Sequence, residues 1–374
     1  MKIKKLKGAI ILLKVYMIQK NIMHKKLNII LPGLGDSGGI KVIKKYQELL
    51  TELGWDVIIY CPVKSYNLHR YKFAFKNLVH QIYCTLKTIF EINKKENIKW
   101  VWKVSDKFIR DADVTMATMW ATAYDVNRLN DYKGSKYYFI QGFEIWDNRE
   151  WGLESYRLPL NKIVISTWIN NKLMETLGIG PFPIVMNGID TNKFSNPYKV
   201  YKPYSETVHL LMLNHTLQKK GVTYGLKSFE KVHEKFPNTE LKMFGMCSSE
   251  GLPEYVEYYQ NPVPEFLVKL YCEADIFIFP SLEEGWGLTP LEAMACKCAV
   301  VGTNTGFVLD IGRDRYNMLI SDAGDIDAMA NNICNLISDH RLLKNISEMG
   351  YTTVKQLEWK RSVLKLKDLL DKER

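Results

Sequence analysis

The sequence predicts an α/β protein built from two Rossmann-like domains, each a parallel sheet covered by helices. Short apolar runs of strand length alternate with longer helical stretches along most of the chain. This alternation begins a second time near residue 208. The chain also has 374 residues with 47% hydrophobic content, so it is too long for one ordinary core.

The first domain is expected to span residues 27–186. It begins with an apolar strand at 27–31, a glycine-containing loop at 33–39 and a helix at 40–53. Further strands are expected at 57–60, 114–117, 137–140, 163–166 and 184–186.

The second domain is expected to span residues 187–350, followed by a closing helix at 351–374. Its strands are expected at 208–212, 241–244, 275–279 and 299–301. Apolar positions along the closing helix, among them Leu357, Trp359 and Val363, need a partner surface.

The loop after the strand at 275–279 is the strongest candidate site. A Pro-Ser pair ends that strand, so Glu284 lies just past its carboxyl end, where ligands bind in open α/β sheets. Gly285 and Gly287 allow the backbone to approach a ligand closely. A glycine loop at 302–306 follows the next strand and is expected to complete the same pocket.

A helix is expected to begin directly after this loop, with Thr289 as its N-cap and Pro290 at its first position. The N–H groups of that turn, at Gly287 and Leu288, would attract an anion. Glu292 has two interpretations. It completes a Thr289-x-x-Glu292 capping box, or it is the second acid of a site, eight residues after Glu284. The combination of strand, acid, glycines, helix start and second acid favours the site.

This arrangement resembles the E-x7-E signature of the retaining glycosyltransferases of family 4, which have the GT-B fold. The stretch 184–190 is similar to that family's interdomain segment, and Lys219-Lys220-Gly221 is similar to its phosphate-binding turn. Trp359 falls where the family has the tryptophan of its terminal crossover helix. The resemblance implies two domains that face each other across a cleft, with the helix at 351–374 crossing back to pack on the first.

The resemblance also implies a nucleotide-sugar site in the second domain. Glu292 would bind the ribose hydroxyls, Glu284 the transferred sugar, and the two lysines the diphosphate. Asn214 stands near a position where the family has an arginine, and it offers only a hydrogen bond. The residues expected to bind the donor are Gly38, Gly39, Asn214, Lys219, Lys220, Glu284, Gly285, Gly287, Leu288 and Glu292.

The expected catalytic residues are Glu284, Lys220, Gln141 and Glu144. Many family members carry a histidine where this chain has Gln141, which forms hydrogen bonds but is not a base. Glu144 is the nearest candidate base. The Tyr-Phe-Ile-Gln string that ends at Gln141 resembles a rhamnosyltransferase-like branch. The family implies front-face attack with retention and a dispensable metal, and the sequence shows no metal-ligand spacing.

Two other functions are consistent with parts of the sequence. Gly33, Gly35 and Gly38 form a G-x-G-x-x-G pattern between a strand and a helix, which is typical of an NAD-dependent Rossmann oxidoreductase. That fingerprint expects an acid at the end of the next strand, where this chain has Tyr60-Cys61-Pro62. A catalytically silent sugar-nucleotide-binding protein is the other alternative, because of Asn214 and Gln141.

The net charge of +10 predicts an anionic partner. A basic extension at residues 1–26 contains eight lysines and no acid. It is either an interfacial helix or the product of an upstream start, with Met23 as the functional first residue. A second zone at 64–107 has ten basic residues, three acids and many aromatic residues. It is either a solvated helix face or a surface that contacts anionic lipid.

The expected function is that of a glycosyltransferase of the hexosyltransferase type, acting on a lipid-linked or polysaccharide acceptor in cell-surface glycan biosynthesis. Its expected partners are the nucleotide sugar, the glycan or lipid-linked acceptor and an anionic membrane, with no nucleic acid and no cofactor. The seven cysteines form no CxxC pair, which indicates a reducing compartment. The expected location is therefore cytoplasmic and peripheral, on the inner face of the plasma membrane.

Overall fold

The computed structural model describes residues 25–35, 37–68, 71–91, 98–201 and 206–372. The basic extension at 1–26 therefore lies outside the described residues except for Lys25 and Lys26, and so does Asp36 of the first glycine loop. The chain divides into two compact units. The described residues up to 138 and residues 157–161 form the first unit, and residues 139–156 and 162 onward form the second.

The first sheet has six strands in the order β3-β2-β1-β4-β5-β6. Its central strands pair in parallel, with Leu27 of β1 beside Val57 of β2 and Val114 of β4. In chain order its strands are β1 (Lys26–Ile30), β2 (Asp56–Pro62), β3 (Ile98–Val101), β4 (Val114–Ala117), β5 (Ser135–Ile140) and β6 (Asn161–Val164). The helices along this stretch are α2 (Gly38–Glu52), α3 (Ala74–Glu91), α4 (Trp120–Arg128), α5 (Arg149–Ser155) and α6 (Thr167–Leu177).

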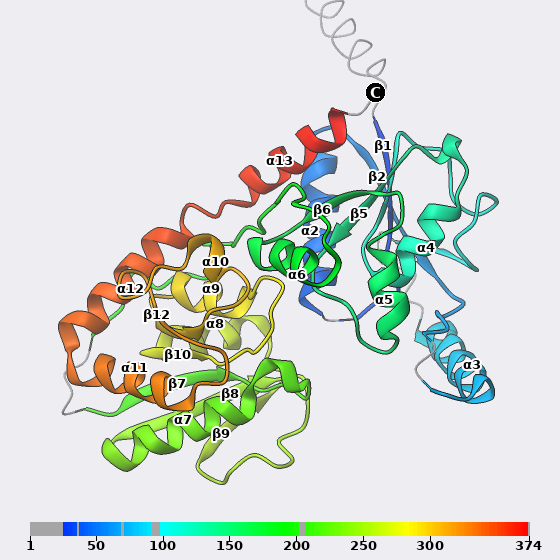
Figure 1. Cartoon of the computed structure of the whole chain (residues 1–374). Coiled ribbons are helices and arrows are strands. Elements are labelled where there is room, and N and C mark those ends of the chain that lie inside the picture. The colour runs from blue at the N-terminus through cyan, green and yellow to red at the C-terminus, as the bar shows by residue number, and fades with distance from the viewer. Residues whose placement is uncertain (1–24, 36, 69–70, 92–97, 202–205, 373–374) are drawn as a thin grey trace, which may run out of the picture. The chain divides into compact units, whose positions relative to one another are not determined.

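The second sheet also has six strands, all parallel, in the order β12-β11-β10-β7-β8-β9. Its strands are β7 (Val208–Leu213), β8 (Thr239–Gly245), β9 (Val256–Gln260), β10 (Ile276–Phe279), β11 (Ala299–Thr303) and β12 (Leu319–Ser321). The helices of this part are α7 (Val222–Lys235), α8 (Pro264–Glu273), α9 (Leu288–Ala295), α10 (Val308–Ile311), α11 (Ile326–Ser338), α12 (His340–Val354) and α13 (Trp359–Asp371) (Figure 1).

The core of the second sheet explains why its strands are nearly continuous apolar runs. Ile276 and Ile278 of β10 are fully buried, and they pack with Phe229 of α7 and Ile333 of α11. Helices on both faces of a parallel sheet exclude water from both faces, so every strand position favours an apolar side chain. β10 is an inner strand, the third from the β12 edge. Its carboxyl end therefore lies between the carboxyl ends of its neighbours β11 and β7.

Most expected strands are confirmed, but three were missed. All three are short strands at sheet edges: exposed positions weaken the apolar pattern of β3 and β9, and β12 has only three residues. The strand expected at 184–186 is wrong, because Ile184 forms only an isolated bridge with Val164. The final helix begins at Trp359 rather than near Tyr351, since α12 continues to Val354. The domain boundaries at 186 and 350, and the packing of the closing helix on the first domain, stay predictions.

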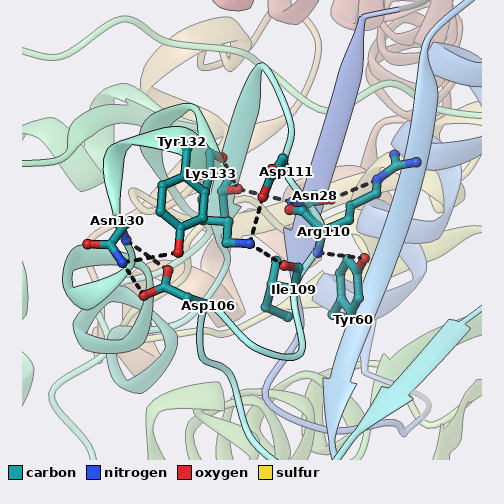
Figure 2. A network of polar contacts seen from close by, with 10 residues as sticks. Asn28, Tyr60, Asp106, Ile109, Arg110, Asp111, Asn130, Tyr132 and Lys133 are labelled. Carbon is teal, nitrogen blue, oxygen red and sulfur yellow. Dashed lines mark hydrogen bonds and ion pairs between the residues drawn. The ribbon is translucent and has the colours of Figure 1, made fainter.

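A polar network ties the loop before β4 to the first sheet (Figure 2). The Lys133 ammonium, with only 4% of its side chain exposed, donates to the Ile109 carbonyl at 2.6 Å and to Asp111 Oδ1 at 2.8 Å. Asn28 of β1 donates to the Arg110 carbonyl at 2.9 Å, and the Arg110 guanidinium binds Asp56. These contacts hold the chain at the start of β4, the strand end opposite to the one where ligands bind in such sheets, so the network is structural.

Replacing Lys133 tests this structural role. Lys133→Met keeps the apolar stem but leaves the Ile109 carbonyl without its donor, so we expect a loss of about 1–3 kcal/mol in unfolding free energy. Lys45→Met is the matched control, because Lys45 forms a surface pair with Glu48 at 2.7 Å, and such pairs contribute less than about 1 kcal/mol. Thermal melting of both variants measures the difference. Equal melting temperatures would contradict the role of the network.

Candidate functional site

The loop after β10 is packed against the turn before α7. Gly221, in the left-handed backbone region at φ 67°, lies so close that a Cβ atom there would be 1.9 Å from the Pro280 carbonyl oxygen. The Lys219 carbonyl accepts hydrogen bonds from the N–H groups of Leu282 at 2.8 Å and Glu283 at 3.2 Å. The lysine turn and the acidic loop, which are about sixty residues apart in sequence, are therefore joined by backbone contacts.

Lys220 and Glu284 form an ion pair at the centre of this contact. Lys220 Nζ lies 2.5 Å from Glu284 Oε2, and the side chains are 20% and 15% exposed. The main-chain N–H of Glu284 donates to Thr305 Oγ1 at 3.0 Å, which fixes the acid from the other side. Two expected residues of the site are thus in direct contact, and both stay partly accessible.

The glycine loop after β11 closes around the same acid. A Cβ atom at Gly306, at φ 60°, would be 2.4 Å from the Trp286 carbonyl oxygen and 3.1 Å from Cγ of Glu284. Thr303 Oγ1 donates to the Ser281 carbonyl at 2.5 Å. The loops that follow β10 and β11 are therefore held together side by side.

Helix α9 begins two residues earlier than the sequence indicated. Its N-cap is Gly287, at φ 98°, and no side chain caps it. The expected N-cap at Thr289 is wrong, so Glu292 is not the partner in a Thr289 capping box. No side chain therefore caps the first N–H group of α9, at Leu288. An anion site at a helix N-terminus needs such an uncapped N–H group.

Glu292 accepts a hydrogen bond from a buried tyrosine. Tyr271 of α8 is fully buried, and its hydroxyl donates to Glu292 Oε2 at 2.9 Å. Burial and the neighbouring carboxylate raise the pKa of Tyr271 well above its ordinary value, so the hydroxyl keeps its proton. Tyr271 was not among the expected site residues, because a tyrosine in an apolar helix carries no sequence signal of the acid that it contacts.

Aromatic packing fixes the position of Tyr271. Phe194, Phe244 and Phe277 lie around its ring, with centroid distances of 5.9, 5.6 and 5.8 Å. Phe194 lies four residues after the stretch 184–190, which resembles the family's interdomain segment. In that stretch the Ile189 N–H donates to the Leu357 carbonyl at 2.8 Å, just before α13.

Gln141 lies directly against the acidic loop. A Cβ atom at Gly285 would be 2.1 Å from the Gln141 carbonyl oxygen, so only glycine fits there. Ser166 Oγ donates to the Gly285 carbonyl at 2.6 Å. The Gln141 side-chain oxygen is buried without a hydrogen-bond partner among the described residues. Because an unpaired buried acceptor costs free energy, this carboxamide is suited to accept from a ligand hydroxyl.

Glu144 follows three residues after Gln141, in the same unit. Its main-chain N–H donates to the Tyr156 hydroxyl at 2.6 Å, and that hydroxyl donates to the Gly142 carbonyl at 3.2 Å. The Phe143 and Tyr156 rings are stacked with centroids 5.8 Å apart. The loop that carries both candidate residues is therefore held in one conformation by Tyr156.

Asn214 and His215 supply hydrogen-bonding groups rather than charge. Asn214 is 7% exposed, and its side-chain NH₂ donates to the Ser248 carbonyl at 3.4 Å. Burial, with Lys220 nearby, lowers the pKa of His215 below its ordinary value. His215 Nδ1 accepts from the Leu217 N–H at 3.0 Å, which requires that nitrogen to be unprotonated. Lys219 and Lys220 are therefore the cations of this turn.

Gly38 and Gly39 belong to the first unit, whereas the other candidate residues belong to the second. Both lie in the first turn of α2, which Ser37 caps by accepting from the Ile40 N–H at 3.4 Å. A Cβ atom would meet nothing within 4 Å at Gly33, and only Ile40 at 4.0 Å from Gly35. The acid that a dinucleotide fingerprint expects at the end of the next strand is missing, since β2 ends with Tyr60, Cys61 and Pro62. The oxidoreductase alternative is therefore not favoured.

Within the described ranges, no group of three or more His, Cys, Asp or Glu side chains is arranged to hold a metal ion. The seven cysteines all lie in these ranges and are free thiols. Cys296 and Cys298 are buried, as expected of small side chains in the core.

Known structures identify the fold of this protein. Sucrose-phosphate synthase from Thermosynechococcus elongatus matches with a TM-score of 0.70 at 15% identity, over 92% of this chain and 98% of that one. HepE from Anabaena, in complex with UDP and glucose, matches with a TM-score of 0.69 at 13% identity, over 94% and 100%. The fold is therefore the GT-B fold of glycosyltransferases.

Sequence comparison makes the assignment more specific. Residues 198–353 match the family model "Glycosyl transferases group 1". The capsular polysaccharide biosynthesis glycosyltransferase CapM of Staphylococcus aureus is 26% identical over 206 residues, which are 51% of this chain and 53% of CapM. The chain spans about half the length, or less, of the curated relatives it matches.

The contact between Gly285 and Gln141 leads to a stability prediction. In Gly285→Ala the added methyl group would overlap the Gln141 carbonyl, so the loop must move at a cost of about 1–3 kcal/mol. Gly33→Ala is the control, because it has open space and no left-handed backbone. Thermal melting should show a lower midpoint for Gly285→Ala alone. If both variants melt like the parent, the close contact is wrong.

The hydrogen bond between Tyr271 and Glu292 can be tested by removing one oxygen atom. Tyr271→Phe keeps the ring packing but leaves the carboxylate without this donor, so we expect about 1–3 kcal/mol lower stability, as for hydrogen bonds to charged groups. Tyr255→Phe is matched to it, since Tyr255 also donates to a glutamate at 2.9 Å but is 42% exposed. Calorimetric melting of the pair should separate them, and an equal effect would mean that burial does not matter here.

Proposed function

We propose that this protein is a glycosyltransferase that moves a sugar from a nucleoside-diphosphate donor to a lipid-linked or polysaccharide acceptor. The observation that carries the proposal is the contact of Lys220 with Glu284 at 2.5 Å, in a loop that leads into the uncapped start of α9. A cation and a helix N-terminus suit a diphosphate, and carboxylates suit sugar hydroxyls. CapM and HepE, whose names refer to polysaccharide biosynthesis and to bound UDP and glucose, agree with this chemistry.

Each group has a role in the proposed reaction. When the bond between the anomeric carbon and the diphosphate oxygen breaks, negative charge builds on the departing diphosphate. Lys219, Lys220 and the N–H group of Leu288 stabilise that charge. Glu284 binds hydroxyls of the transferred sugar. Its ion pair with Lys220 holds the carboxylate and the ammonium group in fixed positions relative to each other. Glu292, held by Tyr271, binds the ribose hydroxyls.

The acceptor side involves the loop after β5. Gln141 offers its unpaired side-chain carbonyl oxygen to a sugar hydroxyl, and Glu144 is the proposed base for the attacking hydroxyl.

We further propose a retaining reaction of the family 4 type without a required metal, as the resemblance of the E-x7-E segment implies. The rhamnosyltransferase-like string at Gln141 supports a hexosyl donor. The product is proposed to be a cell-surface glycan, made at the cytoplasmic face of the plasma membrane.

Donor binding is tested first by thermal stability with UDP, GDP, dTDP, ADP and NAD(H). A ligand at a hundred times its dissociation constant adds about 2.7 kcal/mol, so one nucleoside diphosphate should raise the melting temperature. Glu292→Gln should lose this response because the ribose contact is removed. Glu283→Gln, a change of the neighbouring acid in the same loop, should keep it. A response to NAD(H) alone would overturn the proposal and favour an oxidoreductase.

The lysine is tested by comparing a nucleoside with its diphosphate. Lys220→Met should weaken the diphosphate at least about tenfold and leave the nucleoside almost unchanged, because hydrogen bonds to charged groups contribute about 1.5–3 kcal/mol. Isothermal titration with both ligands measures this split. An equal loss for both would place Lys220 outside the phosphate site.

Turnover separates an enzyme from a silent sugar-nucleotide-binding protein. The parent protein should release the nucleoside diphosphate from the donor that stabilises it, and NMR of the transferred sugar should show the anomeric configuration of the donor. Glu284→Gln should bind the nucleoside diphosphate but lose turnover. Binding without any turnover on a range of acceptors would favour the silent protein.

A further inference from the structure

Helix α3 turns its apolar residues outward. Eight large hydrophobic side chains of this one helix are exposed, up to 75% for Phe75 and 86% for Phe90. A surface helix of a globular protein ordinarily shows the opposite pattern, with its apolar stripe against the core. The outward-facing residues are Phe75, Leu78, Val79, Ile82, Tyr83, Leu86, Ile89 and Phe90. We call this set the outer face of α3.

Polar side chains hold α3 to the protein. Asn77 is 6% exposed, and its carboxamide accepts from the Tyr71 N–H at 2.8 Å and donates to the Tyr71 carbonyl at 2.7 Å. Gln81 donates to the Ser65 carbonyl at 2.7 Å, and Thr85 Oγ1 accepts from the Ser65 N–H at 3.0 Å. These side chains lie one turn apart on one side of the helix. Their hydrogen bonds fix the rotation of the helix, and therefore the outward direction of its apolar residues.

Polar groups lie behind the helix at Gln81. This residue borders a cavity of about 450 Å³, whose walls also include Ser65, Asn67 and Arg128. The helix makes few contacts with other elements and lies at the margin of the first unit, in light blue (Figure 1). Rotating the apolar face inward would break the hydrogen bonds that Gln81 and Thr85 form with the Ser65 backbone, so the outward orientation is the stable one.

Charge indicates what covers the outer face. Lys76 and Lys87 are eleven residues apart, which is about three turns, so they lie along the same flank of the apolar face. Residues 71–90 contain no Asp or Glu. The only acid of α3 is its last residue, Glu91, so two copies of the helix would offer two acids to four lysines, whereas an anionic lipid surface attracts every lysine.

We propose that α3 is a membrane-docking helix, whose outer face enters the interface of an anionic lipid bilayer while Lys76 and Lys87 reach the headgroups. Such helices lie in the plane of the interface, with the apolar face among the acyl chains and long basic side chains extended to the charged layer. None of the helices in the described ranges could cross a bilayer. The inference deepens the membrane contact of the proposed function, but it requires neither donor nor acceptor.

The test is co-sedimentation of the full chain with vesicles of phosphatidylcholine, with and without phosphatidylglycerol. The parent protein should bind the vesicles that contain phosphatidylglycerol. The double variant Phe75→Ser/Leu86→Ser should reduce this binding at least about tenfold, because it removes the centre of the apolar face. Lys76→Ser/Lys87→Ser should reduce it about fivefold per lysine and remove the preference for the anionic lipid. Tyr198→Ser changes a residue that is 88% exposed elsewhere, and it should bind like the parent.

Three results would overturn the proposal. The first is no binding of the parent to either vesicle, and the second is equal binding by the parent and both double variants. The third is a parent dimer in analytical ultracentrifugation that Phe75→Ser/Leu86→Ser dissociates, without vesicle binding, since the outer face would then bind a second copy. The thermal response to nucleoside diphosphate is measured on the same samples. If that response fails while vesicle binding persists, the proposed transfer activity is wrong and the docking helix stands.

Discussion

The candidate site depends on one ion pair, between Lys220 and Glu284. Both side chains are largely buried. Removing either one would therefore leave the charge of the other without its partner and with little access to water. The pair joins the turn before α7 to the loop after β10, and it does so beside the start of α9. A ligand with a phosphate near Lys220 and hydroxyls near Glu284 would contact both members at once, which couples recognition of its two parts.

Close backbone contacts make this geometry specific. Gly221 lies against Pro280, and Gly285 lies against Gln141, at separations that no Cβ atom could occupy. The pair of charged side chains is thus carried by main-chain segments that have little freedom to shift. Glu292 is fixed differently, through Tyr271 and the aromatic rings around it, so the two acids of the E-x7-E segment are supported by independent parts of the second unit.

Helix α3 shows that hydrogen bonds can override hydrophobic periodicity. Its apolar residues recur at helical spacing, which by itself would assign that face to a core. Asn77, Gln81 and Thr85 instead find backbone partners on the protein, and these local contacts decide which face is buried. The sequence showed that residues 64–107 are rich in basic and aromatic residues. It did not show that the apolar side chains of α3 point toward solvent.

The sequence by itself determined the alternation of strands and helices, because buried parallel strands must be apolar along their whole length. It also located the acidic loop, since a strand end, glycines and a helix start are local features. Only the tertiary structure decided the N-cap at Gly287, the partner of Glu292 and the contact of Gln141 with Gly285. It also decided that the segment at 184–186 forms a bridge rather than a strand. These outcomes depend on residues distant in the chain, and side-chain burial and hydrogen bonding between such residues leave no periodic mark in a single sequence.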